Sequence, residues 1–95
     1  MKISICIPTW EQHGYGEIFL QKLLNTITTQ TNKNFNVIIS DHSLTNEIAD
    51  LVEKYKTFFE VVYIKNPNKR GNGPANTNSC IRRADGDIIK VMFQD

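Results

Sequence analysis

The residues best suited to bind a nucleotide follow the first two apolar segments of this chain. Pro8-Thr9-Trp10-Glu11 comes after the first segment, and Asp41-His42-Ser43 comes after the second. A Trp10 ring offers a flat face on which a base can stack, or it packs under the following helix. The Asp41 carboxylate accepts hydrogen bonds from a base or ribose, or it caps the next helix. Base binding is therefore one prediction for each residue, and a structural role is the alternative.

A third polar stretch, residues 66–74, combines two cations with two glycines. Lys69, Arg70 and Gly71 come shortly before Pro74, at which a helix can begin. Cations together with the free N–H groups of a helix start suit a diphosphate. A solvent-exposed basic turn has the same composition, so both interpretations remain open.

The last apolar segment is followed by Gln94 and Asp95. A carboxylate next to nucleotide phosphates is a usual ligand of Mg²⁺ or Mn²⁺, and Asp95 is the predicted metal ligand. The two histidines, His13 and His42, lie far apart in the sequence, and neither is predicted to be a catalytic base.

Strands and helices alternate in the pattern that must position these residues. Segments 3–7, 35–39, 61–64 and 88–93 are apolar and mostly β-branched, which predicts four strands. Two helices are predicted by apolar residues at three- and four-residue spacing, namely Phe19, Leu20, Leu23, Leu24 and Ile27, then Ile48, Ala49, Leu51, Val52 and Tyr55. Ser43 and Thr45 are candidate N-caps of the second of these helices. A third helix is predicted from Pro74, with a weaker stripe of Ala75, Cys80, Ile81 and Ala84, and with Gly86 ending it.

This alternation predicts an α/β fold with a parallel, Rossmann-like sheet. The carboxyl ends of parallel strands share one edge, which is where ligands bind in open α/β sheets. The chain has neither the Gly-x-Gly-x-x-Gly motif of dinucleotide-binding proteins nor the Gly-x-x-x-x-Gly-Lys motif of P-loop enzymes after its first strand.

Length, charge and cysteine content limit the possible number of domains, the partners and the location of the protein. Ninety-five residues allow one domain, and a net charge of +1 gives no overall field to attract nucleic acid or an anionic membrane. Cys6 and Cys80 lie in apolar contexts typical of buried thiols in a reducing compartment, and residues 1–7 are too short for a signal peptide, so we expect a cytoplasmic location. A domain seldom stops at the end of a buried strand, so we expect the chain to be the N-terminal part of a longer domain.

Several motifs occur in order along the chain. They are Ser4-Ile-Cys-Ile-Pro8-Thr9-Trp10, Asp41-His42-Ser43, Asn78, Ala84-Asp-Gly86-Asp87 and Phe93-Gln94-Asp95. In this order they resemble the nucleotide-binding half of family 2 glycosyltransferases, which have the GT-A fold. The resemblance covers essentially the whole chain. It implies an inverting enzyme that moves a sugar from a nucleoside-diphosphate sugar to an acceptor hydroxyl. UDP is the expected nucleotide, because an aromatic face at Trp10 and a single acceptor at Asp41 suit a base with one ring donor.

The resemblance assigns roles by position. Trp10 would stack on the base, Asp41 would accept from it, Thr9 would line the pocket, and Asp95 would bind Mg²⁺ or Mn²⁺. The nucleotide site it implies comprises Pro8, Thr9, Trp10, Glu11, Asp41, His42, Lys69, Arg70, Gly71 and Gln94. The catalytic base and the acceptor site would lie beyond Asp95, and the resemblance leaves membrane association of the complete protein open.

The chain departs from the family pattern at four positions. Glu11 replaces a common Asn, His42 stands where a second acidic residue is frequent, Thr77 replaces a common Arg, and Gln94 precedes Asp95 without an earlier Asp. Two other functions compete with glycosyl transfer. One is a nucleotide-binding module without catalysis. The other is a nucleotidyltransferase, which would show a Gly-rich phosphate loop directly after the first strand.

Overall fold

The structure, a computed structural model, describes residues 2–9, 15–30, 34–43, 45–65 and 73–92, with the backbone alone at 73–75. Strands and helices alternate in the order β1 (Ile3–Thr9), α1 (Tyr15–Thr28), β2 (Phe35–Asp41), α2 (Glu47–Glu53), β3 (Glu60–Lys65), α3 (Gly73–Arg83) and β4 (Ile88–Val91). The predicted α/β fold is confirmed, and each predicted strand and helix is found close to its expected position.

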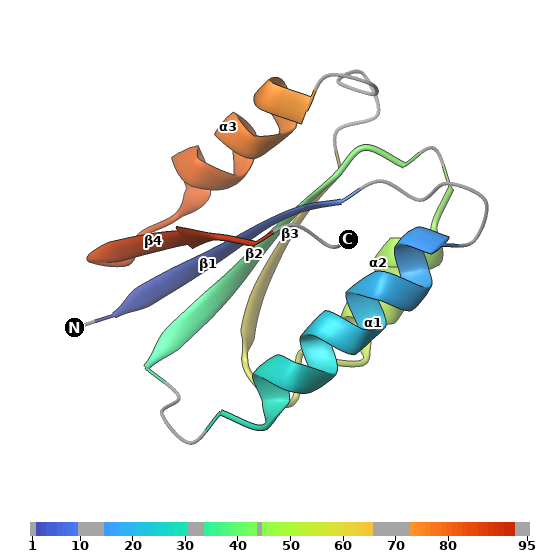
Figure 1. The fold of residues 1–95 in the computed structure, drawn as a ribbon, viewed down its shortest axis with the longest axis horizontal. Helices are drawn as coiled ribbons and strands as arrows, with labels where there is room; N and C mark the ends of the chain where they lie inside the picture. The colour runs from blue at the N-terminus through green and yellow to red at the C-terminus, as the bar shows by residue number, and fades with distance from the viewer. Residues whose placement is uncertain (1, 10–14, 31–33, 44, 66–72, 93–95) are drawn as a thin grey trace.

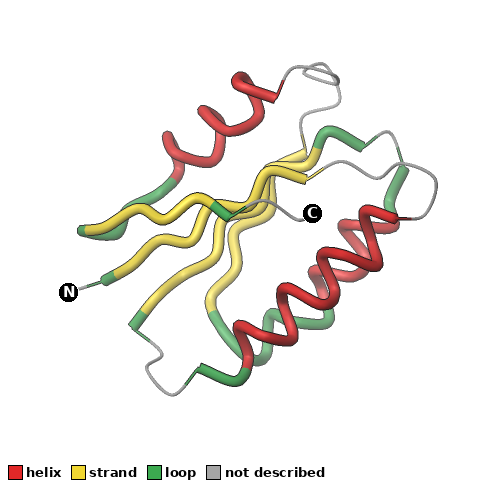
Figure 2. Tube along the Cα trace, in the orientation of Figure 1, coloured by secondary structure: helices red, strands yellow, loops and turns green. Residues whose placement is uncertain are grey.

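The four strands form one parallel sheet in the order β3-β2-β1-β4. Helices α1 and α2 cover one face of the sheet, and α3 covers the other (Figure 1). All the strands run in the same direction, so their carboxyl ends lie at one edge. Figure 2 shows the strands, in yellow, as one layer between the helices, in red. In the register of this sheet Thr9 pairs with Asp41, and Asp41 pairs with Lys65.

Each face of the sheet has its own apolar core. The core under α1 and α2 is the larger of the two and includes Ile7, Leu20, Leu24, Val37, Ile39 and Ile48, all with no exposed surface. The core under α3 is built on Cys6, Ile38 and Cys80, which are also completely buried. Because side chains alternate along a strand, Thr9 and Asp41 share the first face, whereas Ser40 lies on the face of α3.

Gly86 allows the turn between α3 and β4 to pass directly against β1. Its N–H donates to Oγ of Ser4 at 2.8 Å. A Cβ at position 86 would lie 2.7 Å from both the backbone N and the Oγ of Ser4, closer than a real Cβ approaches other atoms. The helix itself ends at Arg83. The sequence predicted that Gly86 ends the helix. In the structure its main role is to allow close packing of the turn on β1.

The predicted caps of α2 are wrong. The N-cap is Asn46, and its side chain makes no capping hydrogen bond, because its Oδ1 accepts from Nζ of Lys65 at 3.0 Å instead. Ser43 lies earlier in the chain, where its backbone N–H is bound to Asp41. Thr45 comes directly before the cap, and its carbonyl oxygen accepts from Lys65.

Two apolar stripes are shorter than predicted. Helix α2 ends at Glu53, because the N–H of Tyr55 donates to the carbonyl of Val52, an i to i−3 bond that tightens the last turn. Tyr55 is nevertheless buried. Phe19 of α1 is 38 % exposed and stacks on Tyr15 instead of entering the core.

Strand β4 lies at the edge of the described sheet. It ends at Val91, although the N–H of Met92 still donates to the carbonyl of Cys6 at 2.9 Å, and Phe93 of the predicted segment lies outside the described residues. Among the described strands it pairs with β1 alone. Ile88 and Ile89 are 46 % and 43 % exposed.

Candidate functional site

The Asp41 carboxylate is the centre of a buried polar cluster at the carboxyl edge of β1, β2 and β3. Its Oδ1 accepts from the backbone N–H of Ser43 at 2.9 Å and lies 3.4 Å from Oγ1 of Thr9. Its Oδ2 accepts from the hydroxyl of Tyr63 at 2.5 Å. Asp41 is completely buried and Thr9 is 1 % exposed. Groups from β1, β3 and the segment after β2 therefore hold the carboxylate in one orientation.

The protein already uses most of the hydrogen-bonding capacity of Asp41. A carboxylate has about four lone-pair sites, and three donors surround this one. The Thr9 hydroxyl is shared, because it also lies 3.5 Å from the carbonyl oxygen of Ser40. A ligand can therefore add one hydrogen bond at Oδ2, and it reaches that atom only after a covering group moves.

The capping alternative for Asp41 is resolved by these contacts. Its side chain binds the N–H of Ser43, two residues ahead, whereas α2 begins after Asn46. The interaction is an Asx turn that shapes the segment after β2, and it leaves the N-terminus of α2 without a carboxylate from this residue.

Tyr63 is a member of the cluster that sequence reasoning did not identify. Burial raises the pKa of its hydroxyl well above the usual value, and the hydrogen bond to Asp41 and the negative charge of that residue raise it further. Tyr63 therefore stays protonated and donates at any physiological pH. In the sequence it is one apolar residue among the others of its strand, and only the pairing of β2 with β3 brings its hydroxyl to Asp41.

His42 follows Asp41 and is 3 % exposed. Its backbone N–H donates to the carbonyl of Thr9 at 3.0 Å, which extends the pairing of β1 with β2 by one residue. Burial lowers the pKa of the imidazole below its ordinary 6.5, with the Asp41 charge opposing the change. Nε2 of His42 is buried and has no hydrogen-bond partner among the residues that the structure describes.

A second polar contact joins α3 to the same edge of the sheet from the opposite face. Asn76, which is 3 % exposed, accepts from Oγ of Ser40 at 2.5 Å and donates through Nδ2 to the carbonyl of Thr9 at 3.3 Å. Sequence reasoning did not select Asn76 or Ser40 either. A polar residue in the first turn of a helix predicted to lie over a sheet is a usable signal for such a contact.

The structure thus brings together three of the predicted site residues, Thr9, Asp41 and His42. Pro8 lies beside them on β1, in register with Ser40. The other predicted residues lie outside the described part of the chain; they are Trp10, Glu11, Lys69, Arg70, Gly71, Gln94 and Asp95. Within the described residues no group of three or more Asp, Glu, His or Cys side chains is placed to hold a metal ion.

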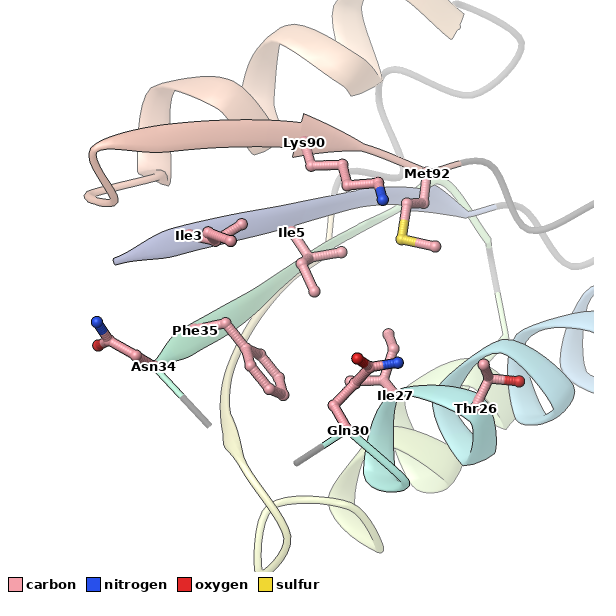
Figure 3. Close-up of a pocket in the computed structure, with 9 residues that line it drawn as sticks. All are labelled: Ile3, Ile5, Thr26, Ile27, Gln30, Asn34, Phe35, Lys90 and Met92. Carbon is pink, nitrogen blue, oxygen red and sulfur yellow. The ribbon is translucent and has the colours of Figure 1, made fainter. Parts of the chain in front are cut away.

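The apolar cavity in Figure 3 is separate from this cluster. It has a volume of about 290 Å³ and lies between the last turns of α1 and the face of β1 and β4, with Ile5, Ile27, Phe35 and Met92 in its wall. None of the residues of the Asp41 cluster lines it.

The two cysteines are free and buried, as predicted. Burial raises the pKa of both thiols, and that of Cys80 reaches about 12. Sγ of Cys80 donates to the carbonyl of Ile38 at 3.2 Å, so these thiols are part of the packing under α3. In the described part of the chain, no helix has the length and apolar character to cross a membrane.

Residues 4–95 match the family model described as glycosyl transferase family 2. The chain therefore belongs to glycosyltransferase family 2, as the sequence motifs indicated.

The chain is also similar to named glycosyltransferases and to a solved structure. Abequosyltransferase RfbV of Salmonella typhimurium is 29% identical over 98 residues, which is 100% of this chain and 28% of that protein. Poly(ribitol-phosphate) beta-glucosyltransferase of Bacillus spizizenii is 29% identical over 96 residues, which is 100% of this chain and 15% of that protein. The crystal structure of Staphylococcus aureus TarS 1-349 in complex with UDP superposes with a TM-score of 0.85 at 25% identity, over 100% of this chain and 28% of that one. The chain thus spans less than a third of these proteins.

Proposed function

We propose that this chain supplies the donor-binding part of an inverting glycosyltransferase that takes a sugar from a nucleoside-diphosphate sugar, with UDP as the preferred nucleotide. The observation that carries the proposal is the buried Asp41 carboxylate, oriented by Thr9, Ser43 and Tyr63 at the carboxyl edge of the sheet. Two further facts support it. Ligands of open α/β sheets bind at this edge, and Staphylococcus aureus TarS, which has a similar fold, was crystallised with UDP.

In the proposed reaction the residues of this chain bind and orient the donor. In UDP the uracil ring keeps one N–H, because its other ring nitrogen carries the ribose. Oδ2 of Asp41 has room for one further donor, so the number of donors and the number of free acceptor sites agree. The surrounding donors fix the carboxylate before the ligand arrives, which reduces the entropy lost on binding. The acceptor hydroxyl would attack the anomeric carbon as the nucleoside diphosphate leaves, and the base that takes its proton is expected beyond Asp95.

The phosphate and metal contacts are also part of the proposal. Lys69, Arg70 and Gly71 would contact the diphosphate, and Asp95 would bind Mg²⁺ or Mn²⁺, the cations that suit carboxylate and phosphate oxygens. A bound divalent ion would offset the charge of the leaving diphosphate. A cytoplasmic location is proposed as well, supported by the free thiols of Cys6 and Cys80.

Calorimetric titration of the complete protein with UDP, GDP and ADP tests the nucleotide assignment. We expect UDP to bind most tightly, and Asp41→Asn to weaken its binding by about tenfold or more, since a charged acceptor is replaced by an amide. Asp41→Ala should weaken it further, but it also leaves the hydroxyl of Tyr63 without its acceptor. A melting curve must therefore show that each variant is folded. Equal affinity for the three nucleotides, or unchanged affinity in a folded Asp41→Asn variant, would contradict the assignment.

The metal assignment has its own test. In the complete protein, Asp95→Asn is expected to abolish Mn²⁺-dependent nucleotide binding and sugar transfer, and to leave the melting temperature of the unliganded protein nearly unchanged. The reason is that a carboxylate at the end of a strand contributes little to folding when its role is to bind an ion. Sugar transfer that survives the substitution, or that proceeds undiminished in a chelator, would show that Asp95 is not a metal ligand.

A further inference from the structure

Cys6 and Cys80 form a pair of buried thiols that the proposed function does not use. Cys6 belongs to the inner strand β1 and Cys80 to α3, and neither residue has any exposed surface. With Ile38 they form the buried core under α3. The two thiols share a hydrogen bond, which opposes the rise that burial causes in the pKa of Cys6. Their side chains are therefore direct neighbours across the boundary between the sheet and the helix.

The closed structure protects both thiols from reaction. A cysteine attacks a disulfide as its thiolate, and burial raises the pKa of both groups, that of Cys80 to about 12. A side chain with no exposed surface is also out of reach of a dissolved reagent. Oxidation of this pair must therefore begin in molecules in which α3 has moved away from the sheet.

Helix α3 is attached to the sheet through a small apolar core. Among the described residues, three buried side chains form this core, whereas thirteen form the core under α1 and α2. Hydrogen bonds of Asn76 and Gly86 hold the two ends of the helical segment. Elements with few buried apolar contacts open locally more often than the main core of a domain. When α3 opens, both thiols meet water, and their pKa values return toward that of a free cysteine.

We propose that Cys6 and Cys80 are a site of oxidative modification, at which a low-molecular-weight disulfide such as oxidised glutathione joins them and tethers α3 to β1. In the open state, the thiolate of one cysteine attacks a sulfur of the glutathione disulfide and releases one glutathione. As α3 returns, the other cysteine loses its proton and attacks the protein sulfur of this mixed disulfide, which releases the second glutathione. The two cysteines together give up two protons and two electrons, and the glutathione disulfide takes them up to become two thiols.

The tether lies one helical turn from a contact at the carboxyl edge of the sheet. Asn76 precedes Cys80 by four residues, so the two share one face of α3, and its Nδ2 donates to the carbonyl of Thr9 on β1. A disulfide would add a covalent link below this hydrogen bond, and α3 could then no longer leave the sheet. In a reducing compartment the link is transient, because reduced glutathione reverses the exchange.

Incubation of the complete, folded protein with oxidised glutathione tests the site. We expect peptide mapping by mass spectrometry without reductant to find the Cys6 and Cys80 peptides joined, and dithiothreitol to separate them. Cys6→Ala and Cys80→Ala should each prevent this product, since one partner is missing. Amide hydrogen exchange of residues 76–83 should be about tenfold or more slower in the oxidised protein than in the reduced one, because the tether opposes opening.

Two variants test whether opening of α3 limits the reaction. Asn76→Ala removes the hydrogen bonds to Ser40 and to the carbonyl of Thr9, and we expect it to speed formation of the disulfide about tenfold. Tyr55→Phe is the matched control, because it removes a hydrogen bond to Asn25 on the opposite face of the sheet. It should leave the rate unchanged.

Several outcomes would overturn the proposal. Folded protein without the Cys6 to Cys80 link, or with glutathione attached to single cysteines only, would refute the site. A link that forms only in denaturant would refute it as well. Exchange in α3 that is equally fast before and after oxidation would refute the tether, and equal acceleration by Asn76→Ala and Tyr55→Phe would show that the whole domain must unfold first. Because no step needs a bound nucleotide, each of these results leaves the proposed function standing.

Discussion

Asp41 shows how the neighbours of a buried carboxylate can hold it in one orientation. Its carboxylate is fully buried, yet the backbone of Ser43 and the hydroxyls of Thr9 and Tyr63 offset the loss of water. Hydrogen bonds to a charged group contribute more to stability than those between neutral groups. Of the three donors, the hydroxyl of Tyr63 is one that a substitution can delete while the rest of the side chain stays in place.

Tyr63→Phe deletes this bond and keeps the ring. We expect the free energy of unfolding to fall by about 1.5–3 kcal/mol, the range for hydrogen bonds to charged groups. Chemical denaturation of both proteins measures it, with an unchanged dependence on denaturant as the sign that only stability has changed. A loss below about 0.5 kcal/mol would mean that Tyr63 contributes little to holding Asp41.

The lowered pKa of His42 predicts a dependence of stability on pH. Because the folded-state pKa lies below the unfolded value of 6.5, the unfolded chain takes up the proton first as the pH falls. The stability associated with the neutral imidazole is therefore complete above about pH 6.5 and is lost as the pH falls toward the folded-state pKa.

Melting curves of the wild type and of His42→Gln check this at about pH 7.5 and about pH 5.5, on either side of the ordinary histidine value. Other groups titrate in both proteins, so the difference between them reports His42. We expect the wild type to lose more stability than the variant over this interval. Equal losses would contradict the buried, neutral state of the imidazole.

Sequence reasoning found part of this site for a physical reason. Thr9 and Asp41 are the last residues of β1 and β2, and the carboxyl edge of a parallel sheet brings such residues together. Tyr63 and Asn76 were not found because their roles depend on which atoms meet across two strands or between a helix and a strand. Those contacts follow from register and packing, which no spacing in the sequence specifies.

At the scale of elements, the attachment of α3 depends on contacts at both of its ends. Asn76 in its first turns binds Ser40 and the end of β1, and Gly86 after its last turn packs on Ser4. The strands and helices themselves were predicted well, because β-branched segments and apolar stripes are strong local signals. The caps of α2 were not, because the helix begins later than the predicted caps Ser43 and Thr45, after Asn46, whose side-chain oxygen accepts from Lys65 of β3.

Gly86→Ala tests the closer of these contacts. The added Cβ would lie 2.7 Å from the backbone N of Ser4, which side-chain movement cannot relieve. We expect a loss of about 1–3 kcal/mol, as for overpacked sites, measured by denaturant unfolding. Adding Ser4→Gly removes the Oγ contact but leaves the backbone contact, so it should not restore wild-type stability. A fully stable Gly86→Ala protein would show that the turn can move away from β1 at little cost.

At the scale of the whole molecule, β4 is an edge strand, because it pairs with β1 alone among the strands that the structure describes. Ile88 and Ile89 are partly exposed there, and the apolar cavity of Figure 3 lies on the same side of the sheet, between β4, β1 and α1. An exposed strand edge with apolar side chains can pair with another copy of itself. The sequence analysis treats this segment as a buried strand of a longer domain, in which its outer edge is expected to be covered.

Residues 1–95 alone are therefore expected to self-associate. Light scattering over a range of concentrations measures this, and Ile89→Lys, which places a charge on the edge strand, should reduce it. The same substitution should change the stability of the fold little, because Ile89 is 43 % exposed. A monodisperse monomer at high concentration, with cooperative unfolding, would instead show that these residues form a self-sufficient domain.

The contact between Ser40 and Asn76 has a consequence for how the sequence can diverge. The two residues lie on different elements, and the Ser40 hydroxyl donates to the Asn76 side chain in a buried position. A change to an apolar residue at position 76 alone would remove this acceptor and the donor to the carbonyl of Thr9 together. In homologous sequences, the residue types at positions 40 and 76 should therefore vary as a pair, polar with polar and apolar with apolar.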